Sequence, residues 1–436
     1  MHTVAGMFKR ILTLTACVVL GVALAVAGRR VAAAWWNPFP PRDLTKSSAY
    51  VREVMQLVNE NYVDEKAAAF DQLAKNAIHG MVESLDPHSE FLEAKDNKEF
   101  EEDLTGEFGG IGIEVASRNG RAIVIAAIAD TPGARAGIQR GDEIVSIDGK
   151  PVDNATVGSS VVSQLRGKPK TKVAVGLFRP ATHANLNFTL VREVIKIESV
   201  RDVRLLADGV GYVQLTEFSE HTGEQFGKAL DQLIEEGMTS LVLDVRNNPG
   251  GLLDAAVDVA EPFFKKGELI VYTQGRKPGD REDLRAERDG APLDLPVAVL
   301  INAGSASAAE VLTGALKDTG RAVVVGERSF GKGSVQSVFT LKNGEGLRLT
   351  TARYYTPSGV SIHEKGIAPQ VEVIMTPDED DKLSRQNARP DLADPKEFKE
   401  RFGFEPIEDR QLEAALDVLK GVRLLGERAA GRVTAR

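Results

Sequence analysis

The sequence has little cysteine, few histidines and no excess of positive charge. Cys17 is the only cysteine among 436 residues, so an internal disulfide and a cysteine-based metal site are both excluded. The 54 Lys and Arg residues are outnumbered by 63 Asp and Glu residues, which gives a net charge of −9. Because nucleic-acid-binding proteins concentrate positive charge on one face, we expect no nucleic-acid partner. The remaining composition, 42% hydrophobic and 27% charged, is typical of a globular chain of more than one domain.

Long hydrophobic runs are scarce too, with one exception near the N-terminus. Residues 11–28 carry no charge and are mostly apolar, and Lys9 and Arg10 precede them. This pattern is typical of a signal peptide or a membrane anchor. We favour a retained anchor, and small residues at 25–27 and 32–34 leave removal by signal peptidase as the alternative. Both outcomes predict a periplasmic protein, anchored to the inner membrane through residues 11–28 or released after cleavage.

Beyond residues 1–36, the chain divides into four parts by composition. Residues 44–107 show helical spacing of apolar side chains and predict a small helical region. Residues 108–192 contain short β-branched runs broken by Gly and Pro, which predict a compact β module. Strands and helices alternate over residues 193–375, as in α/β layers. Residues 376–436 read as an acidic linker followed by an amphipathic helix, which we expect to act as a docking or dimerisation arm.

Apolar runs in the α/β part predict its buried strands. The following runs are apolar throughout and should be buried on both faces of a sheet: residues 240–245, 296–302 and 322–327. A helix is predicted over residues 222–236, where Thr222 and Gln225 have the spacing of a capping box.

Glycines open the β module. In the run GGIGIEV, the backbone N–H groups of Gly110, Ile111, Gly112 and Ile113 can converge on a carboxylate, because no glycine Cβ obstructs the approach. The runs TPGARAGI and RGDEIVSIDG follow further along the chain. Together these motifs resemble a PDZ domain, which implies that a protein C-terminus binds as an added strand with its carboxylate in the glycine loop. Arg166 either reports peptide binding to a neighbouring domain or is a surface ion-pairing residue.

A serine stands where a predicted buried strand passes into a helix. In the run NAGSASAAE, the hydroxyl of Ser307 would lie at a helix N-terminus, where backbone N–H groups stabilise negative charge. The alternative is that Ser307 only caps the helix, with Glu310 completing a capping box. Further along, Lys332 lies between two glycines and is either an exposed loop charge or a base.

Three rival motifs fail on inspection. The run from Gly326 to Lys332 nearly matches a P-loop, but Gly333 replaces the required Ser or Thr and a strand follows instead of a helix. We therefore expect no nucleotide and no cofactor. A nucleophile elbow of the G-x-S-x-G type is absent around Ser307, and only His363 of the six histidines lies in the α/β motifs, which disfavours a histidine-dependent triad.

Four motifs in register identify a family. They are DVRNNPGG at 244–251, GSASAAE at 304–310, FGKGSVQ at 330–336 and ARYYTPSG at 352–359. From about residue 45 to 375, the chain resembles the carboxy-terminal processing proteases, the tail-specific serine peptidases of family S41. The resemblance implies a core fold of the ClpP/crotonase type and a Ser-Lys dyad, with Ser307 as nucleophile, Lys332 as general base and Gln336 orienting the lysine. It also implies a homo-oligomer formed through the helical ends and, in some relatives, a partner lipoprotein.

The chemistry of such a dyad makes further demands on the residues. Lys332 acts as a base only when neutral, so its pKa must fall, and we expect desolvation by Phe330, Val335 and Val338 to lower it. Gln336, four residues after Lys332, would share a face with it on a strand and accept from the amine.

The oxyanion of such a reaction needs two N–H donors. We expect one from Ala308, the residue after the nucleophile, and the other from Gly250 or Gly251, where glycine permits close approach. The choice between the two glycines stays open at this point.

The sequence thus predicts a multidomain α+β protein, with a PDZ β module, a ClpP/crotonase-like α/β protease core and helical N- and C-terminal arms. Its predicted function is that of an exported, ATP-independent serine endopeptidase that recognises protein C-termini. The main alternative is a non-catalytic PDZ adaptor or chaperone on a degenerate protease core. A nucleotide-binding protein built on the near P-loop is the third hypothesis.

Overall fold

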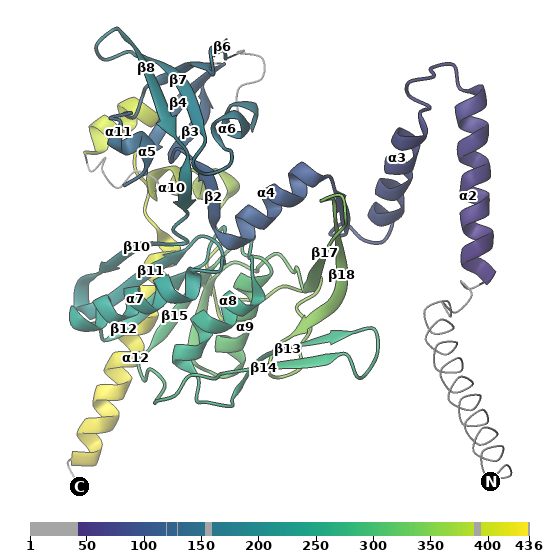
Figure 1. Ribbon diagram of the computed structural model, residues 1–436. Helices are drawn as coiled ribbons and strands as arrows, with labels where there is room; N and C mark the ends of the chain where they lie inside the picture. The colour runs from purple at the N-terminus through teal and green to yellow at the C-terminus, as the bar shows by residue number, and fades with distance from the viewer. Residues whose placement is uncertain (1–41, 119, 129, 153–158, 388–393, 435–436) are drawn as a thin grey trace, which may run out of the picture. The chain divides into compact units, whose positions relative to one another are not determined.

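A computed structural model describes residues 42–118, 120–128, 130–152, 159–387 and 394–434 (Figure 1). The chain separates into two compact units, with the division after Leu85. The predicted signal or anchor at residues 11–28 lies outside the described residues. Among the residues that the structure describes, no helix combines the length and the apolar character needed to cross a bilayer.

The first unit contains helices α2 (Arg42–Asn61) and α3 (Phe70–Glu83). The second unit begins with a turn at Asp86, strand β1 (Glu90–Leu92) and helix α4 (Ala94–Thr105). Helical structure is thus present where the apolar spacing predicts it, but β1 interrupts it.

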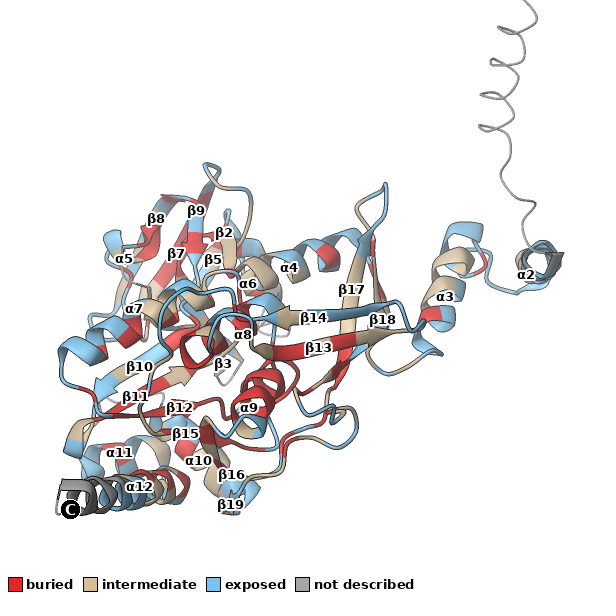
Figure 2. Ribbon diagram, turned by 90° about the horizontal axis from the view of Figure 1, so that it is seen from below, coloured by how far each residue is buried: buried red, intermediate tan, exposed pale blue. Residues whose placement is uncertain are grey.

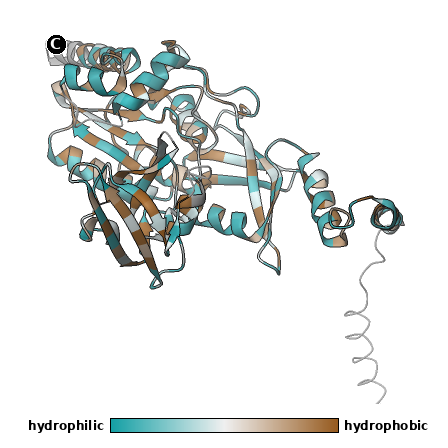
Figure 3. Cartoon of the chain, turned by 90° about the horizontal axis from the view of Figure 1, so that it is seen from above, coloured by the Kyte–Doolittle hydropathy of each residue, from teal (hydrophilic) through white to brown (hydrophobic). Residues whose placement is uncertain are grey.

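The β module is a sheet in the order β3-β4-β5-β7-β8, with β6 paired to β5. Its elements are β3 (Ile113–Arg118), β4 (Arg121–Ala127), α5 (Pro132–Arg135), β5 (Glu143–Ile147), β6 (Lys150–Pro151), α6 (Ser159–Leu165), β7 (Lys172–Arg179) and β8 (Ala184–Val191). Hydrophobic and hydrophilic residues alternate along these strands (Figure 3), because one face covers a core around Val124, Val173 and Leu177. Strands β2 (Glu107–Gly110) and β9 (Glu193–Lys196) pair with each other where the chain enters and leaves the module.

The α/β part is built on a sheet in the order β10-β11-β12-β15-β16-β19. Its strands are β10 (Val200–Leu205), β11 (Val210–Leu215), β12 (Ser240–Asp244), β15 (Val297–Ile301), β16 (Ala322–Gly326) and β19 (Val371–Glu372). All neighbours are parallel except β10 and β11. Every residue of β12 and β15 is buried, as is every residue of β16 except half-buried Val323, which confirms the prediction of strands covered on both faces (Figure 2).

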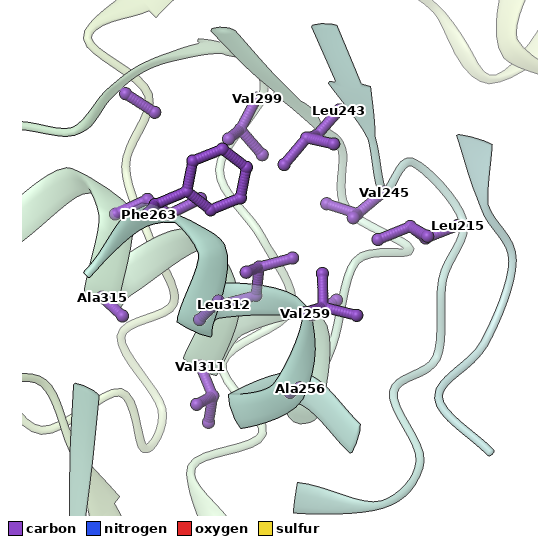
Figure 4. Close-up of a cluster of buried hydrophobic side chains, with 14 of the residues drawn as sticks. Leu215, Leu243, Val245, Ala256, Val259, Phe263, Val299, Val311, Leu312 and Ala315 are labelled. Carbon is purple, nitrogen blue, oxygen red and sulfur yellow. The ribbon is translucent and has the colours of Figure 1, made fainter. Parts of the chain in front are cut away.

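Helices cover the two faces of this sheet. On one face lie α7 (Thr222–Glu235), α8 (Leu253–Ala260), the short helix η2 (Glu261–Phe263) and α9 (Ala308–Asp318), packed around a core that includes Phe263, Val299 and Leu312 (Figure 4). On the other face lies α12 (Arg410–Thr434), whose Leu419 packs with Leu300 and other strand residues. The predicted docking arm therefore covers a sheet of its own chain along its first half.

A second sheet stands beside the first and carries part of the site. Its order is β1-β18-β13-β14, with β17 also paired to β18. The strands besides β1 are β13 (Leu269–Gly275), β14 (Arg281–Arg285), β17 (Ser334–Thr340) and β18 (Gly346–Tyr355).

Two local predictions are wrong. Thr222 and Gln225 form no capping box, because the side chain of Gln225 accepts hydrogen bonds from the N–H groups of Ser199 and Val200 instead. The predicted linker contains helix α10 (Pro377–Asn387), and α11 (Pro395–Phe402) follows it. Acidic residues in the first turn of α10 favour the helix through its dipole, and Leu383 buries its apolar face.

Candidate active site

Ser307 lies at the turn from β15 into α9 and is strained. It is the N-cap residue of α9, is 6% exposed, and has φ = +54°, an uncommon value for a residue with a Cβ. Its backbone N–H donates to Glu310 Oε2 at 2.9 Å. Gly250 lies against it so closely that a Cβ built on Gly250 would be 2.6 Å from the Cβ of Ser307. These contacts hold a conformation that the chain would otherwise avoid.

Glu310 connects the Ser307 turn to the Lys332 loop. Besides the N–H of Ser307, its carboxylate accepts the N–H of Lys332 at 2.9 Å and the N–H of Gly331 at 2.7 Å. The hydroxyl of Ser329 donates to it as well. Burial raises the pKa of Glu310, and the four donors oppose that shift. The sequence pattern indicates only a helix cap for Glu310. The signal that it does more is a charged residue among the apolar residues at the start of α9.

A cavity of about 570 Å³ brings the predicted residues together. Ser307, Lys332, Gln336, Gly250 and Gly251 all line it. Other walls come from α4, from β18 and from the loop before Phe218; they include Phe100, Asp103, Leu104, Glu217, Arg348 and Tyr354. Residues from the second sheet, from α4 and from loops that follow strands of the first sheet thus surround one space, and only the tertiary structure could place them there.

The pKa of Lys332 is lowered by its position in this cavity. Desolvation lowers the pKa of the Lys332 amine, and the positive charge of Arg348 lowers it further, while Glu90 and Glu310 act in the opposite direction. Val335 and Val338 line the cavity as predicted. Phe330 does not line the cavity. Its backbone N–H donates to Ser305 O, and its side chain lies at the surface, where it is 64% exposed.

The amide of Gln336 has partners on one side only. Its Nε2 donates to Thr350 Oγ1 at 2.8 Å and to Ser334 Oγ at 3.2 Å. Its Oε1 is buried and has no hydrogen-bond partner among the described residues. The shared-face argument for Lys332 and Gln336 is wrong in detail, because Lys332 precedes β17 and the pairing register shifts between Val335 and Gln336. Both side chains nevertheless reach the same cavity.

The predicted backbone donors are the residue after Ser307 and two glycines that line its cavity. The N–H of Gly250 donates to Asn248 Oδ1 at 2.8 Å and is therefore occupied. In the described part of the chain, the N–H groups of Gly251 and Ala308 donate to no acceptor. Gly251 has φ = +141°, a conformation that favours glycine. Of the two glycines left open by the sequence, Gly251 has the available donor.

A second cavity, of about 470 Å³, lies in the β module. Its lining includes all four residues predicted to bind a carboxylate, Gly110, Ile111, Gly112 and Ile113, together with residues of α6. Arg166 follows α6 and lines the same cavity.

The contacts of Arg166 lead toward the first cavity. Its guanidinium lies 4.4 Å from the centre of the Phe108 ring and 3.7 Å from Glu102 Oε2. Glu102 belongs to α4, the helix whose Phe100, Asp103 and Leu104 line the cavity of Ser307. Helix α4 therefore contacts a residue of one cavity and forms a wall of the other.

Comparison with known proteins adds family information. The family model for peptidase family S41 matches residues 209–373, and the model for the PDZ domain matches residues 109–190. These matches confirm the predicted combination of a PDZ module with an S41 protease core.

Its sequence relatives include carboxy-terminal processing proteases. A carboxy-terminal-processing protease of Bartonella bacilliformis is 41% identical over 336 residues, which are 75% of this chain and 75% of that protein. The carboxy-terminal processing protease CtpA of Bacillus subtilis is 36% identical over 69% of this chain and 64% of its own length. Among solved structures, a photosystem II D1 C-terminal processing protease is 31% identical, with a TM-score of 0.43 over 74% of this chain and 92% of that one. Because it is similar in sequence to these relatives over most of its length, the chain belongs to the carboxy-terminal processing proteases, which are serine peptidases of family S41.

Proposed function

We propose that this protein is an exported, ATP-independent endopeptidase that cleaves protein substrates with Ser307 as nucleophile and Lys332 as general base. One observation carries the proposal. Ser307 and Lys332 line a single cavity, and the carboxylate of Glu310 binds the backbone N–H of both. The lowered pKa of Lys332 supports it, because a neutral amine is the form that accepts a proton.

The reaction follows from these positions. The neutral amine of Lys332 takes the proton of the Ser307 hydroxyl while Oγ attacks the substrate carbonyl carbon. The N–H groups of Ala308 and Gly251 stabilise the resulting oxyanion. Collapse of the intermediate breaks the C–N bond, and the Lys332 ammonium returns its proton to the leaving amine. Water then attacks the acyl-enzyme with Lys332 again as base, which releases the new carboxylate and restores Ser307.

In this scheme, Gln336 orients Lys332. Its Oε1 has no partner among the described residues, so during the reaction it is the acceptor that takes an N–H of the amine and directs the lone pair toward Ser307. Phe330 makes no contribution to desolvation, whereas Val335 and Val338 do.

Substrate selection is assigned to the β module. A protein C-terminus adds as a strand, and its carboxylate binds the N–H groups between Gly110 and Ile113. We assign Arg166 a gating role over the alternative of a merely structural ion pair, because it contacts both the peptide cavity and α4. The proposal also includes export through residues 11–28, a periplasmic location, a homo-oligomer and a partner lipoprotein.

The test is cleavage of an unstructured protein with an apolar C-terminus. Ser307→Ala and Lys332→Ala should each reduce kcat/KM by about 10³-fold or more while thermal melting stays cooperative. Lys342→Ala, at an exposed position, is the matched control and should keep wild-type activity. Full activity in either site variant refutes the dyad. A wild-type protein that binds the substrate without cleaving it supports the adaptor alternative.

A further inference from the structure

The orientation of the Gln336 side-chain amide matters in the proposed site. The oxygen and nitrogen of a glutamine side chain exchange places when the amide turns by half a rotation. With Oε1 toward Lys332, Gln336 accepts an N–H and leaves the lone pair of the amine free. With Nε2 there, Gln336 would donate to that lone pair and block the base. Other contacts must therefore determine which way the amide faces.

Thr350 supplies the stronger contact. Gln336 Nε2 lies 2.8 Å from Thr350 Oγ1, across the pair of strands β17 and β18, and 3.2 Å from Ser334 Oγ. A hydroxyl has one hydrogen and accepts as well as donates, so by itself Thr350 would tolerate either end of the amide. The amide is fixed only if the Thr350 hydrogen is used elsewhere.

The Asp86 carboxylate is an acceptor near Thr350 that can take that hydrogen. Partial burial raises the pKa of its carboxyl, but hydrogen bonds from Ser89, His88 and Thr350 outweigh burial and hold the pKa below the usual range. An ionised carboxylate only accepts, so a Thr350 hydroxyl that donates to Asp86 can only accept from Gln336.

The carboxylate of Asp86 is itself held in a tight turn. Its Oδ1 accepts the N–H of His88 at 2.8 Å and of Ser89 at 2.9 Å, and its Oδ2 accepts the hydroxyl of Ser89 at 2.8 Å. Ser89 Oγ in turn accepts the N–H of Thr350 at 3.1 Å. Strand β1 follows and pairs Glu90 with Arg348 on β18. The turn is thus attached to the backbone of the residue whose hydroxyl it orients.

We propose that Asp86 and Thr350 are positioning residues that hold the Gln336 amide with Nε2 toward Thr350 and Oε1 toward Lys332. The buried, unpartnered Oε1 is the acceptor that this arrangement leaves available in the cavity. The inference rests on the proposed function, since it assigns Gln336 the role of orienting Lys332.

The decisive variant is Thr350→Val, which removes the hydroxyl and leaves the Asp86 turn in place. We expect kcat to fall by about ten- to a hundredfold with little change in KM, because the base is misoriented while substrate binding is untouched. The acid limb of the kcat/KM profile should move to lower pH, because loss of the carbonyl contact destabilises the Lys332 ammonium. Thr350→Ser should restore both. Thr351→Val is the matched control: its hydroxyl binds Ser337 at 2.7 Å on the exposed side of the same strands.

A second measurement separates positioning from simple loss of structure. If Thr350 acts through Gln336, then in a Gln336→Ala background Thr350→Val should change kcat by less than about twofold. Asp86→Asn should resemble Thr350→Val, because its amide can donate to Thr350 and release the hydroxyl hydrogen toward Gln336. Equal losses in both backgrounds, or an unchanged kcat in Thr350→Val, would overturn the inference. Ser307→Ala and Lys332→Ala remain inactive in that case, whereas failure of the proposed function itself would leave them active.

Discussion

The contact between Gly250 and Ser307 makes a demanding prediction. Gly250 has φ = +101°, and a Cβ at this position would lie 2.6 Å from Ser307 Cβ, 2.8 Å from Ala306 O and 3.0 Å from Ala308 N. Gly250→Ala therefore presses on the nucleophile and on the donor that follows it. Both neighbours are backbone or Cβ atoms, so no flexible side chain can move aside.

The size of the effect follows from these distances. Nonbonded carbon atoms prefer separations of about 3.5–4.0 Å, so Ser307 must move by roughly 1 Å. A displacement of that size at a reacting group costs on the order of 10²-fold in rate. The left-handed backbone adds strain of about 1–3 kcal/mol, which lowers the free energy of unfolding. We expect Gly250→Ala to lose activity far beyond what its stability loss explains.

Gly237→Ala is the control that isolates backbone strain. Gly237 has φ = +90°, but nothing lies within 4 Å of the position of its Cβ. Both variants should lose stability in thermal melting, and Gly250→Ala should lose more because of its steric clashes. Only Gly250→Ala should lose kcat/KM on a peptide substrate. Wild-type activity in Gly250→Ala, or an equal loss of activity in Gly237→Ala, would refute the reasoning.

Two further predictions concern charges around the base. Because Arg348 lowers the pKa of Lys332, Arg348→Met should raise that pKa and move the acid limb of the kcat/KM profile to higher pH, so that activity lost at pH 7 returns at alkaline pH. The control is Arg353→Met, at an exposed position of the same strand, which should leave the pH profile unchanged. An unmoved acid limb in Arg348→Met would contradict the electrostatic account. Glu310→Gln replaces one acceptor oxygen with an N–H donor that faces the N–H groups of Ser307 and Lys332. Activity should therefore fall, and the free energy of unfolding measured with denaturant should fall by about 1–3 kcal/mol per unsatisfied group. A stable, active variant would show that the carboxylate does not join the two loops.

Local sequence patterns predicted the elements that depend on local forces. Strands β12, β15 and β16 were recognisable because a strand buried on both faces needs apolar residues throughout. The predictions of a capping box at Thr222 and of a linker where α10 forms are wrong, because Gln225 binds the distant Ser199 and Leu383 is buried in the tertiary structure. A local pattern carries no information about such partners.

The sequence by itself determined the family, the β module and the identity of Ser307, Lys332 and Gln336 as candidates, because each is read from residue types at short spacing. The tertiary structure decided how they are held. Glu310 joins two loops, Gly250 lies where a Cβ would clash with Ser307, and Thr350 binds Gln336 across two strands. These relations join segments far apart in the chain, and only the packing of the sheets and helices brings their atoms within hydrogen-bonding or van der Waals distance.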